Sequence, residues 1–175
     1  MTKKIVLFGA PGAGKGTLAS LIKKSNSIVH ISTGDLFREN IKKQTQIGNE
    51  ATKYIDAGQL VPDSIVIKMV KDRISKEDVI KNGFLLDGFP RTLAQAKALD
   101  EICELDSVVV LNIDKEILKK RILGRMSCPK CGKIYNKFNP RFQPARDNLC
   151  DDCEVELAHR GEDTETTFEN RWQTY

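Results

Sequence analysis

The sequence lacks most features that mark membrane, secreted or nucleic-acid-binding proteins. No apolar run approaches the roughly 20 residues of a membrane span, and the N-terminal stretch "MTKKIVLF" is too short and too charged for a signal peptide. Lysine- or arginine-rich blocks are absent, and aromatic residues make up only 6% of the chain. These absences argue against a membrane partner and against a nucleic-acid partner. They favour a cytoplasmic location.

The remaining composition is that of an ordinary globular protein. The 175 residues are 40% hydrophobic and 30% charged, enough for one domain with a sizeable core and smaller inserts. The net charge of +4 permits anionic ligands without requiring nucleic acid. Five cysteines in a reducing compartment argue against a disulfide framework.

Strand and helix patterns alternate along the chain, which predicts a parallel sheet with helices on both faces. The stretch "DSVVVLNID" is apolar without alternation, so we expect this strand to be buried on both faces. Asp35 is the expected cap of one helix, Gly58 the expected stop of the next, and Pro62 is expected in a first helical turn. The predicted strands are 3–8, 27–32, 83–88 and 106–114, and the predicted helices are 15–24, 35–44, 47–58, 62–75, 92–103, 115–126 and 164–175.

The stretch "GAPGAGKGT" (9–17) stands between a strand pattern and a helix pattern. Missing side chains let backbone N–H groups approach a phosphate chain, and the helix N-terminus that follows favours anions. Lys15 supplies a mobile positive charge for the outer phosphates. The usual pattern has Ser or Thr directly after this lysine; here Gly16 stands there, so Thr17 is the candidate metal contact. A flexible turn is the alternative, but the flanking strand, helix and lysine favour phosphate binding.

A second signal is "GFLLDGFPR", in which a buried strand ends at Asp87. A carboxylate beside the phosphate loop would hold water around Mg²⁺. The alternative is that Asp87 only ends the strand.

Four of the five cysteines form two pairs, Cys128-x-x-Cys131 and Cys150-x-x-Cys153, separated by 18 residues. This spacing predicts a tetrahedral zinc site, and four thiolates leave no open position for substrate. The metal would therefore be structural and would hold together a loop-rich insert. Disulfides, redox thiols, bound iron and a nucleic-acid-binding zinc ribbon are the alternatives. Cys103 lies outside the cluster and is expected to be buried.

Five motifs in this order resemble adenylate kinase, in its long, zinc-containing bacterial-type form. They are "GAPGAGKGT", "ISTGDLFR", "DAGQLVPD", "LLDGFPRTLAQA" and "CPKC…CDDC", and the resemblance covers essentially the whole chain. It implies reversible, Mg²⁺-dependent transfer of a phosphoryl group from ATP to AMP, giving two ADP, in adenine nucleotide homeostasis. The implied fold is a P-loop nucleoside monophosphate kinase with a parallel five-stranded core. A monomer is also implied.

The resemblance divides the chain into a core (1–31, 62–125 and 163–175), an insert that binds the nucleoside monophosphate (32–61) and a zinc-containing lid (126–162). Family members continue past the position of Tyr175 with two helices and a core strand. We therefore expect the C-terminal part of the core to be missing after 175, which would expose an unpaired sheet edge and weaken stability and activity.

The implied site residues fall into three groups. Because the acceptor is an already anionic phosphate oxygen, no general base is needed, and His30 and His159 are not expected to be catalytic. Arginines, whose guanidinium groups bind phosphate oxygens in pairs, carry catalysis instead. Arg121 is expected one turn before Arg125 on one helix, stacking on the adenine of ATP. The catalytic set is Lys15, Arg91, Arg125, Arg160 and Arg171; ATP contacts are Gly12, Ala13, Gly14, Lys15, Gly16, Thr17, Arg121, Arg125, Ile134 and Tyr135; AMP contacts are Thr33, Arg38, Gln59, Leu60, Val61, Gly88, Phe89, Pro90, Arg91, Gln95, Arg160 and Arg171.

Two alternatives to the leading interpretation stay open at this stage. Another nucleoside monophosphate kinase shares the phosphate-binding motifs, and a nucleotide-binding protein with little turnover would share them too. One motif also departs from the family: "RGED" has Glu162 where the family usually has Asp, at a hinge of the lid.

Overall fold

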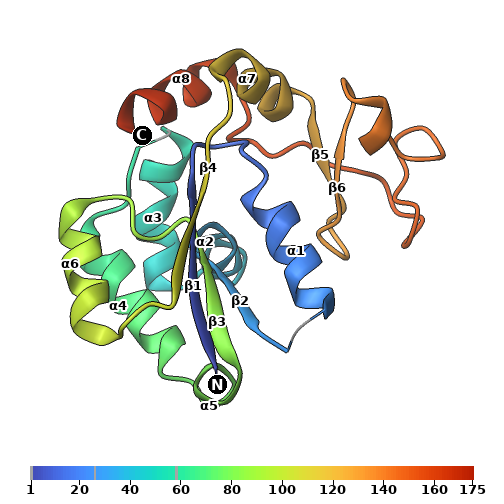
Figure 1. Ribbon diagram of the computed structural model, residues 1–175. Helices are drawn as coiled ribbons and strands as arrows, with labels where there is room; N and C mark the ends of the chain where they lie inside the picture. Colours follow the sequence, from blue (N-terminus) through green and yellow to red (C-terminus); the bar gives the residue numbers. More distant parts are fainter. Residues whose placement is uncertain (1, 26, 58) are drawn as a thin grey trace.

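A parallel sheet forms the centre of the protein. The computed structural model describes residues 2–25, 27–57 and 59–175, so the predicted helix stop at Gly58 lies outside the described residues. The sheet has the strand order β2-β3-β1-β4 (Figure 1). The predicted α/β class is confirmed, but the described residues supply four strands to this sheet rather than the expected five. The strands are β1 (Lys3–Gly9), β2 (Val29–Ser32), β3 (Gly83–Asp87) and β4 (Ser107–Leu111).

Helices cover both faces of the sheet. In Figure 1, α1 (Lys15–Ser25) lies on one side of β1 and β3, while α4 (Asp63–Ile74) and α6 (Leu93–Ile102) lie on the other. At the carboxyl ends of the strands, α7 (Lys115–Leu123) and α8 (Glu165–Thr174) lie side by side. The remaining helices are α2 (Thr33–Lys42), α3 (Gln46–Asp56) and α5 (Glu77–Asn82).

Alternating strand residues build two cores. Val6 and Leu86 point into the larger core, which α2, α3, α4 and α6 complete. Leu7 and Leu85 point to the opposite face, against α1. All four side chains are at most 2% exposed. Burying a Val or Leu side chain stabilises the fold by about 1.5–3 kcal/mol, so β1 and β3 form the firmest part of the scaffold that positions the loops.

The prediction that the fourth strand is buried on both faces is wrong. In β4, the side chains of Val108, Val109 and Val110 are 56%, 37% and 59% exposed. The reason is position: β4 pairs in parallel with β1 along one edge, and no other described strand pairs with it. An apolar run predicts a strand, but it does not reveal whether that strand is central or at the edge.

Two helix boundaries also differ from the predictions. Ser32, not Asp35, caps α2, because its hydroxyl accepts a hydrogen bond from the Asp35 backbone N–H at 3.2 Å. Helix α7 ends at Leu123 with Gly124 as its C-cap, so Arg125 lies in the next strand instead of on the helix with Arg121.

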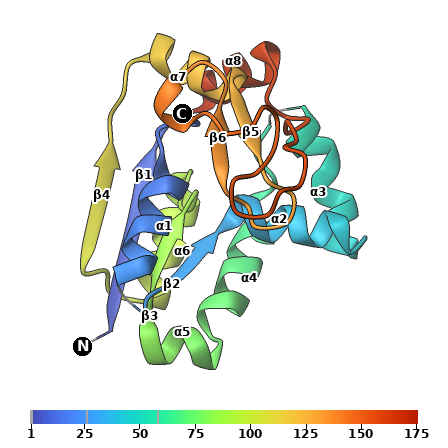
Figure 2. The ribbon, with the colours of Figure 1, turned by 90° about the vertical axis from the view of Figure 1, so that its right-hand side faces the viewer.

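The segment 126–162, called here the cysteine insert, has a small core of its own. Strands β5 (Arg125–Ser127) and β6 (Ile134–Asn136) pair antiparallel at its base, and a short 3₁₀ helix spans Pro140–Phe142. Figures 1 and 2 show these strands and the following loops to one side of the parallel sheet. The core contains few apolar side chains, namely Met126, Tyr135 and Leu157, packed with the cysteines.

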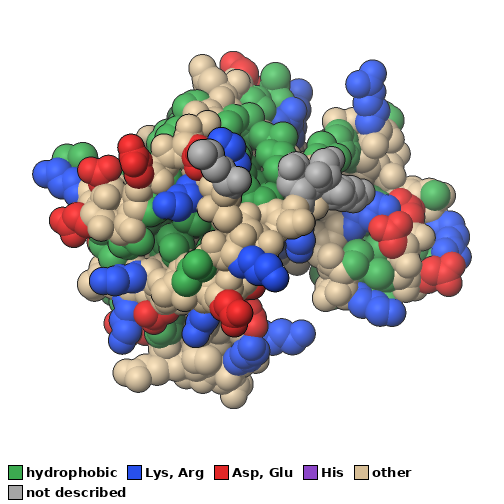
Figure 3. All heavy atoms as spheres, turned by 60° about the horizontal axis from the view of Figure 1, so that its bottom comes forward, with side chains coloured by type: hydrophobic (Ala, Val, Ile, Leu, Met, Phe, Trp, Pro, Cys, Tyr) green, Lys and Arg blue, Asp and Glu red, His purple; other side chains and the backbone are tan. Residues whose placement is uncertain are grey.

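The described helices are all too short or too polar to cross a membrane. On the face shown in Figure 3, lysine and arginine side chains are intermixed with aspartate and glutamate. This face therefore presents no broad field of one sign.

Asp106, the residue before β4, is predicted to contribute stability that depends on pH. It accepts a hydrogen bond from the Lys4 backbone N–H at 2.8 Å and another from Lys3 Nζ at 3.2 Å, and both lower the pKa of Asp106. A lowered pKa gives a contribution that is present above the unfolded pKa and is lost as pH falls through the folded one. Asp106→Asn should therefore lower the urea midpoint at neutral pH and have a smaller effect near about pH 3. Glu104→Gln, at an exposed neighbour, is the matched control; an equal loss at both pH values would contradict the prediction.

Candidate functional site

Three neighbouring strands end at one edge of the sheet. Leu7 of β1 pairs with Asp87 of β3, and Ser32 of β2 pairs with the same Asp87. The phosphate loop (9–17), which follows β1, therefore starts beside the Asp87 carboxylate. Binding sites of parallel α/β sheets lie at such strand ends.

The phosphate loop has the backbone that its glycines allow. Gly12 and Gly14 have φ values of +81° and +97°, in the left-handed region that L side chains rarely adopt. A Cβ at Gly12 would also come within 2.9 Å of Ile122 Cγ1 in α7. Glycine at these positions leaves backbone N–H groups uncovered at the start of α1, where the helix dipole favours an anion.

Lys15 folds back over the loop. Its Nζ donates hydrogen bonds to the carbonyl oxygens of Gly9 at 2.8 Å and Ala10 at 3.0 Å. Burial lowers the pKa of Lys15, and the charges of Arg91 and Arg125 act in the same direction. A bound phosphate would supply a negative charge beside these three cations.

Asp87 lies on the other side of the loop start. Its Oδ2 would be 3.7 Å from a Cβ on Gly16, so the carboxylate faces the first turn of α1. Its negative charge raises the pKa of Lys15, against the dominant effect of burial. Carboxylates near phosphates are ligands that Mg²⁺ accepts, commonly through water, so Asp87 and Thr17, which line the same cavity, are residues that fit such an ion.

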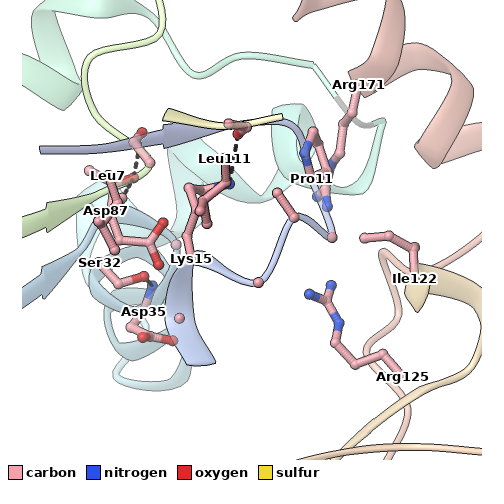
Figure 4. Close-up of a pocket in the computed structure, with 18 of the residues that line it drawn as sticks. Leu7, Pro11, Lys15, Ser32, Asp35, Asp87, Leu111, Ile122, Arg125 and Arg171 are labelled. Carbon is pink, nitrogen blue, oxygen red and sulfur yellow. Dashed lines mark hydrogen bonds between the residues drawn. The ribbon is translucent and has the colours of Figure 1, made fainter. Parts of the chain in front are cut away.

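A cavity of about 640 Å³ opens in front of the loop and collects all of the chain's predicted cationic site residues. In Figure 4, Arg171 reaches in from α8 and Arg125 from the start of β5, and both guanidinium groups lie toward the loop. The cations that line the cavity are Lys15, Arg38, Arg91, Arg121, Arg125, Arg160 and Arg171.

The clustered arginines affect one another electrostatically. Desolvation, followed by the nearby charges of Arg125 and Arg38, lowers the pKa of Arg160 to about 10. The side chain of Arg91 is exposed at the cavity, but many protein atoms surround its guanidinium group. The resulting desolvation, together with the charge of Arg171, lowers the pKa of Arg91. Several like charges held together, and only partly offset by nearby carboxylates, form a site prepared for a polyanion.

Acidic residues hold two of these arginines. Asp163, whose side chain is 1% exposed, accepts two hydrogen bonds from Arg125, one of them 2.7 Å from Nε. Arg38 donates to Asp35 and, at 3.3 Å, to Glu162. Sequence reasoning missed Asp163 as a partner of Arg125 and Asp35 as a partner of Arg38, and it treated Glu162 only as a hinge residue. The motif "RGED" was the available signal for two of the three.

The loop after β3 is tied to α2. Thr33, 2% exposed, donates to the Gly88 carbonyl oxygen at 2.9 Å, and Arg91 Nε donates to the same oxygen at 2.8 Å. Gly88 has φ +81°, and a Cβ there would come within 2.8 Å of Thr33 Oγ1. Gln95, at 1% exposure, lies deeper in the same wall.

The cavity wall contains nearly every predicted contact. Phe89 is the exception: it is 1% exposed and packs in the larger core instead of lining the cavity. Tyr135 lines the cavity, but its hydroxyl contacts Cys150 Sγ at 3.5 Å inside the cysteine insert. The other predicted contacts in the wall are Gly12, Ala13, Gly14, Gly16, Thr17, Thr33, Gln59, Leu60, Val61, Gly88, Pro90, Gln95 and Ile134.

The four paired cysteines converge. The Sγ atoms of Cys128, Cys131, Cys150 and Cys153 all lie within 4.8 Å of one another, and those of Cys131 and Cys150 are 3.7 Å apart. Zinc–sulfur bonds of about 2.3 Å place tetrahedral thiolates about 3.8 Å apart. The spacing fits such an ion and is too long for a disulfide. Cys103 lies outside the cluster and is partly buried.

Comparison with known proteins agrees with this geometry. A family model described as adenylate kinase matches residues 7–175. The adenylate kinase of Clostridium botulinum (strain Hall) is 51% identical over 178 residues, which cover 98% of this chain and 81% of that protein. The adenylate kinase of Clostridium perfringens (strain 13 / Type A) is 49% identical over 181 residues, covering 100% of this chain and 81% of that protein. Similarity of this extent, together with the phosphate loop and its ring of cations, shows that the chain belongs to the adenylate kinase family.

Proposed function

We propose that the cavity holds ATP and AMP with their phosphate groups meeting over the phosphate loop. The chain is a nucleoside monophosphate kinase, and its reaction is ATP + AMP = 2 ADP, which balances the adenine nucleotides. The observation that carries the proposed arrangement is the convergence of Lys15 and six arginines on one cavity. Two nucleotides bring several negative charges to a single place, and a single nucleotide would leave part of this cationic ring unpaired.

On the ATP side, the backbone N–H groups of Gly12 to Thr17 wrap the phosphates. Lys15 exchanges its hydrogen bonds to the Gly9 and Ala10 carbonyls for the transferred phosphoryl group. Arg121, on α7, donates to the Ala13 carbonyl oxygen at 3.5 Å and lines the cavity, and its guanidinium group stacks on the adenine of ATP. Ile134 and Tyr135 contact ATP from the cysteine insert, Tyr135 through its main chain because its ring is packed inside.

On the AMP side, Arg91 and Arg38 bind the phosphate, and Thr33 and Gly88 shape the turn beside it. Gln95 reads the adenine edge. The backbone of 59–61 closes the base pocket. Phe89 supports this pocket from the core, and Pro90 lies at its wall.

Catalysis follows from position and charge. The attacking oxygen of AMP is already anionic, so the protein needs no base, and the barrier falls as cations neutralise the charge that spreads over the transferring group. Lys15, Arg91, Arg125, Arg160 and Arg171 supply this charge. Mg²⁺, which adenylate kinases use with ATP, would be held through water by Asp87 with Thr17 nearby, and it supplies further charge neutralisation on the phosphates.

The chain works as a core (1–31, 62–125 and 163–175) with two movable inserts, 32–61 and the cysteine insert. A hydrogen bond already links them, since Arg38 of the first contacts Glu162 at the end of the second. When both inserts close, they exclude water that would otherwise accept the phosphoryl group.

Zinc in the cysteine insert has a structural role. Four thiolates complete a tetrahedral shell, and the insert has few apolar side chains to stabilise it otherwise. Two of the basic residues nearby are paired with acids, as in Lys133–Asp152 at 3.0 Å and Arg146–Glu154, which argues against a basic strip for nucleic acid. Reducing conditions keep such thiols available, which supports a cytoplasmic location. One chain supplies the phosphate loop and all seven cations that line the cavity, so a monomer is sufficient for the proposed site.

We expect AMP to be the preferred acceptor. With ATP as donor, kcat/KM for AMP should exceed that for GMP, UMP or CMP by at least about a hundredfold, because a site built to hydrogen-bond one base leaves buried polar groups unpaired with another. Initial rates of ADP formation with each nucleotide measure this preference. A higher kcat/KM for any other monophosphate would assign the chain to that acceptor instead.

A further inference from the structure

The amide group of Gln95 is held from both ends. Its Oε1 accepts a hydrogen bond from the Arg91 backbone N–H at 2.8 Å, and its Nε2 donates one to Asp63 Oδ1 at 2.7 Å. The side chain is 1% exposed and lines the cavity. The two ends of an amide have nearly the same shape, so its hydrogen-bond partners decide which end is oxygen and which is nitrogen.

The Arg91 N–H can only donate and faces the oxygen end of the amide, and Asp63 makes the choice at the nitrogen end. Asp63 is the first residue of α4, and its second oxygen, Oδ2, accepts a hydrogen bond from Thr92 Oγ1 at 2.8 Å. Thr92 in turn caps α6, because its hydroxyl accepts from the Gln95 backbone N–H at 3.1 Å. An ionised carboxylate only accepts hydrogen bonds. Only the NH₂ end of Gln95 can therefore face Asp63.

The fixed amide leaves one donor and one acceptor free. Nε2 retains its second N–H, and Oε1 retains its second lone pair. Adenine presents the complementary pair on its base-pairing edge, a ring nitrogen that accepts and an amino group that donates. A 6-oxopurine presents the reverse, a ring N–H that donates and a carbonyl oxygen that accepts. The orientation set by Asp63 and the Arg91 N–H therefore matches a 6-aminopurine and opposes a 6-oxopurine of the same shape.

We propose that Asp63 is a positioning residue that selects 6-aminopurine monophosphates by fixing the amide of Gln95. Asp63 acts through Gln95 and does not contact the substrate. The inference rests on the proposed contact between Gln95 and the adenine of AMP.

The test compares AMP with IMP, which differs in the 6-substituent and the ring-nitrogen proton. In Asp63→Asn, the new amide can donate as well as accept, so it no longer fixes the nitrogen end of Gln95. The turned-over amide then loses only the hydrogen bond from the Arg91 N–H and can pair with a 6-oxopurine. The ratio of kcat/KM for AMP to that for IMP should fall about tenfold or more, while kcat at saturating AMP changes less. Asp72→Asn, at an exposed acid on the same helix, makes the same charge change and should leave the ratio unaltered.

A second variant covers the case in which Asp63→Asn does not fold. Asp63→Ser keeps a residue that is favourable at a helix start and also removes the group that can only accept, so the same fall in the ratio is expected. A merely structural role would lower the rates with AMP and IMP together and leave their ratio unchanged.

Gln95→Leu separates the inference from the contact on which it rests. If Gln95→Leu leaves the AMP to IMP ratio unchanged, Gln95 does not read the base, and the role of Asp63 falls with it. If Gln95→Leu lowers the ratio but both Asp63 variants keep it within about twofold, the contact stands and the positioning role is overturned. Adding Asp63→Asn to Gln95→Leu should produce no further fall, because residues that act through one another are not additive.

Discussion

Replacing Lys15 with methionine is expected to lower kcat by about a thousandfold, the size of effect seen when one main charge-stabilising donor is removed from a transition state. Methionine has a similar length but no charge, so the transferring phosphoryl group loses the cation nearest to the loop. The reason lies in the placement of Lys15, whose Nζ is already held over the loop by the Gly9 and Ala10 carbonyls. Initial rates of ADP formation measure the effect.

Lys23→Met is the matched control, because Lys23 is an exposed lysine on the same helix. It should leave kcat within about twofold, since exposed surface substitutions have small effects. If Lys15→Met folds normally and keeps more than a tenth of the activity, the proposed role of Lys15 is wrong.

The second large effect concerns the four cysteines. Replacing Cys150 with serine breaks the tetrahedral set, and the cysteine insert has too little apolar burial to replace the metal. We expect Cys150→Ser to lower the free energy of unfolding by about 3 kcal/mol, well below what structural zinc sites supply. At about 2–4 °C per kcal/mol, this loss lowers Tm by ~10 °C. Activity should fall as well, because both Arg160 and Ile134 lie within the insert and line the cavity.

Elemental analysis, calorimetry and the ADP assay together test this prediction. The protein should contain one zinc per chain, and Cys150→Ser should contain much less. Cys103→Ser, outside the cluster, should retain both the metal and the Tm. A metal-free protein with an unchanged Tm in Cys150→Ser would show that the cluster is not a structural metal site.

The parts of the site that could be predicted from the sequence are those encoded by local spacing. The phosphate loop needs glycines and a lysine within nine residues, and the cysteine cluster needs two close pairs. The position of Asp87 beside the loop follows from a further rule, that parallel strands end at the same edge of a sheet, and the pairing of Leu7 with Asp87 agrees with it.

What could not be predicted depends on partners distant in the sequence. The contact between Asp63 and Gln95 joins two helices, and the contact between Arg38 and Glu162 joins two inserts. No local pattern encodes either one. The exposure of β4 is similar in kind: its valines predict a strand, whereas its place at the edge depends on which strands pair with it.

The convergence of the arginines could be predicted only in part. Each arginine alone resembles a solvated surface charge, and family resemblance was needed to single out Arg125, Arg160 and Arg171. The structure brings all three to one cavity, where Asp163 orients Arg125, and where burial, followed by the charges of Arg125 and Arg38, lowers the pKa of Arg160.

The most direct test of two nucleotides meeting in one cavity is the stoichiometry of the reaction. With Mg²⁺, ATP and a limiting amount of AMP, the nucleotides and inorganic phosphate are quantified by chromatography as the reaction proceeds. Two ADP should form for each AMP consumed, with no release of inorganic phosphate above the enzyme-free rate. Release of inorganic phosphate from ATP without loss of AMP, or binding of ATP with no ADP formed, would contradict phosphoryl transfer between two bound nucleotides.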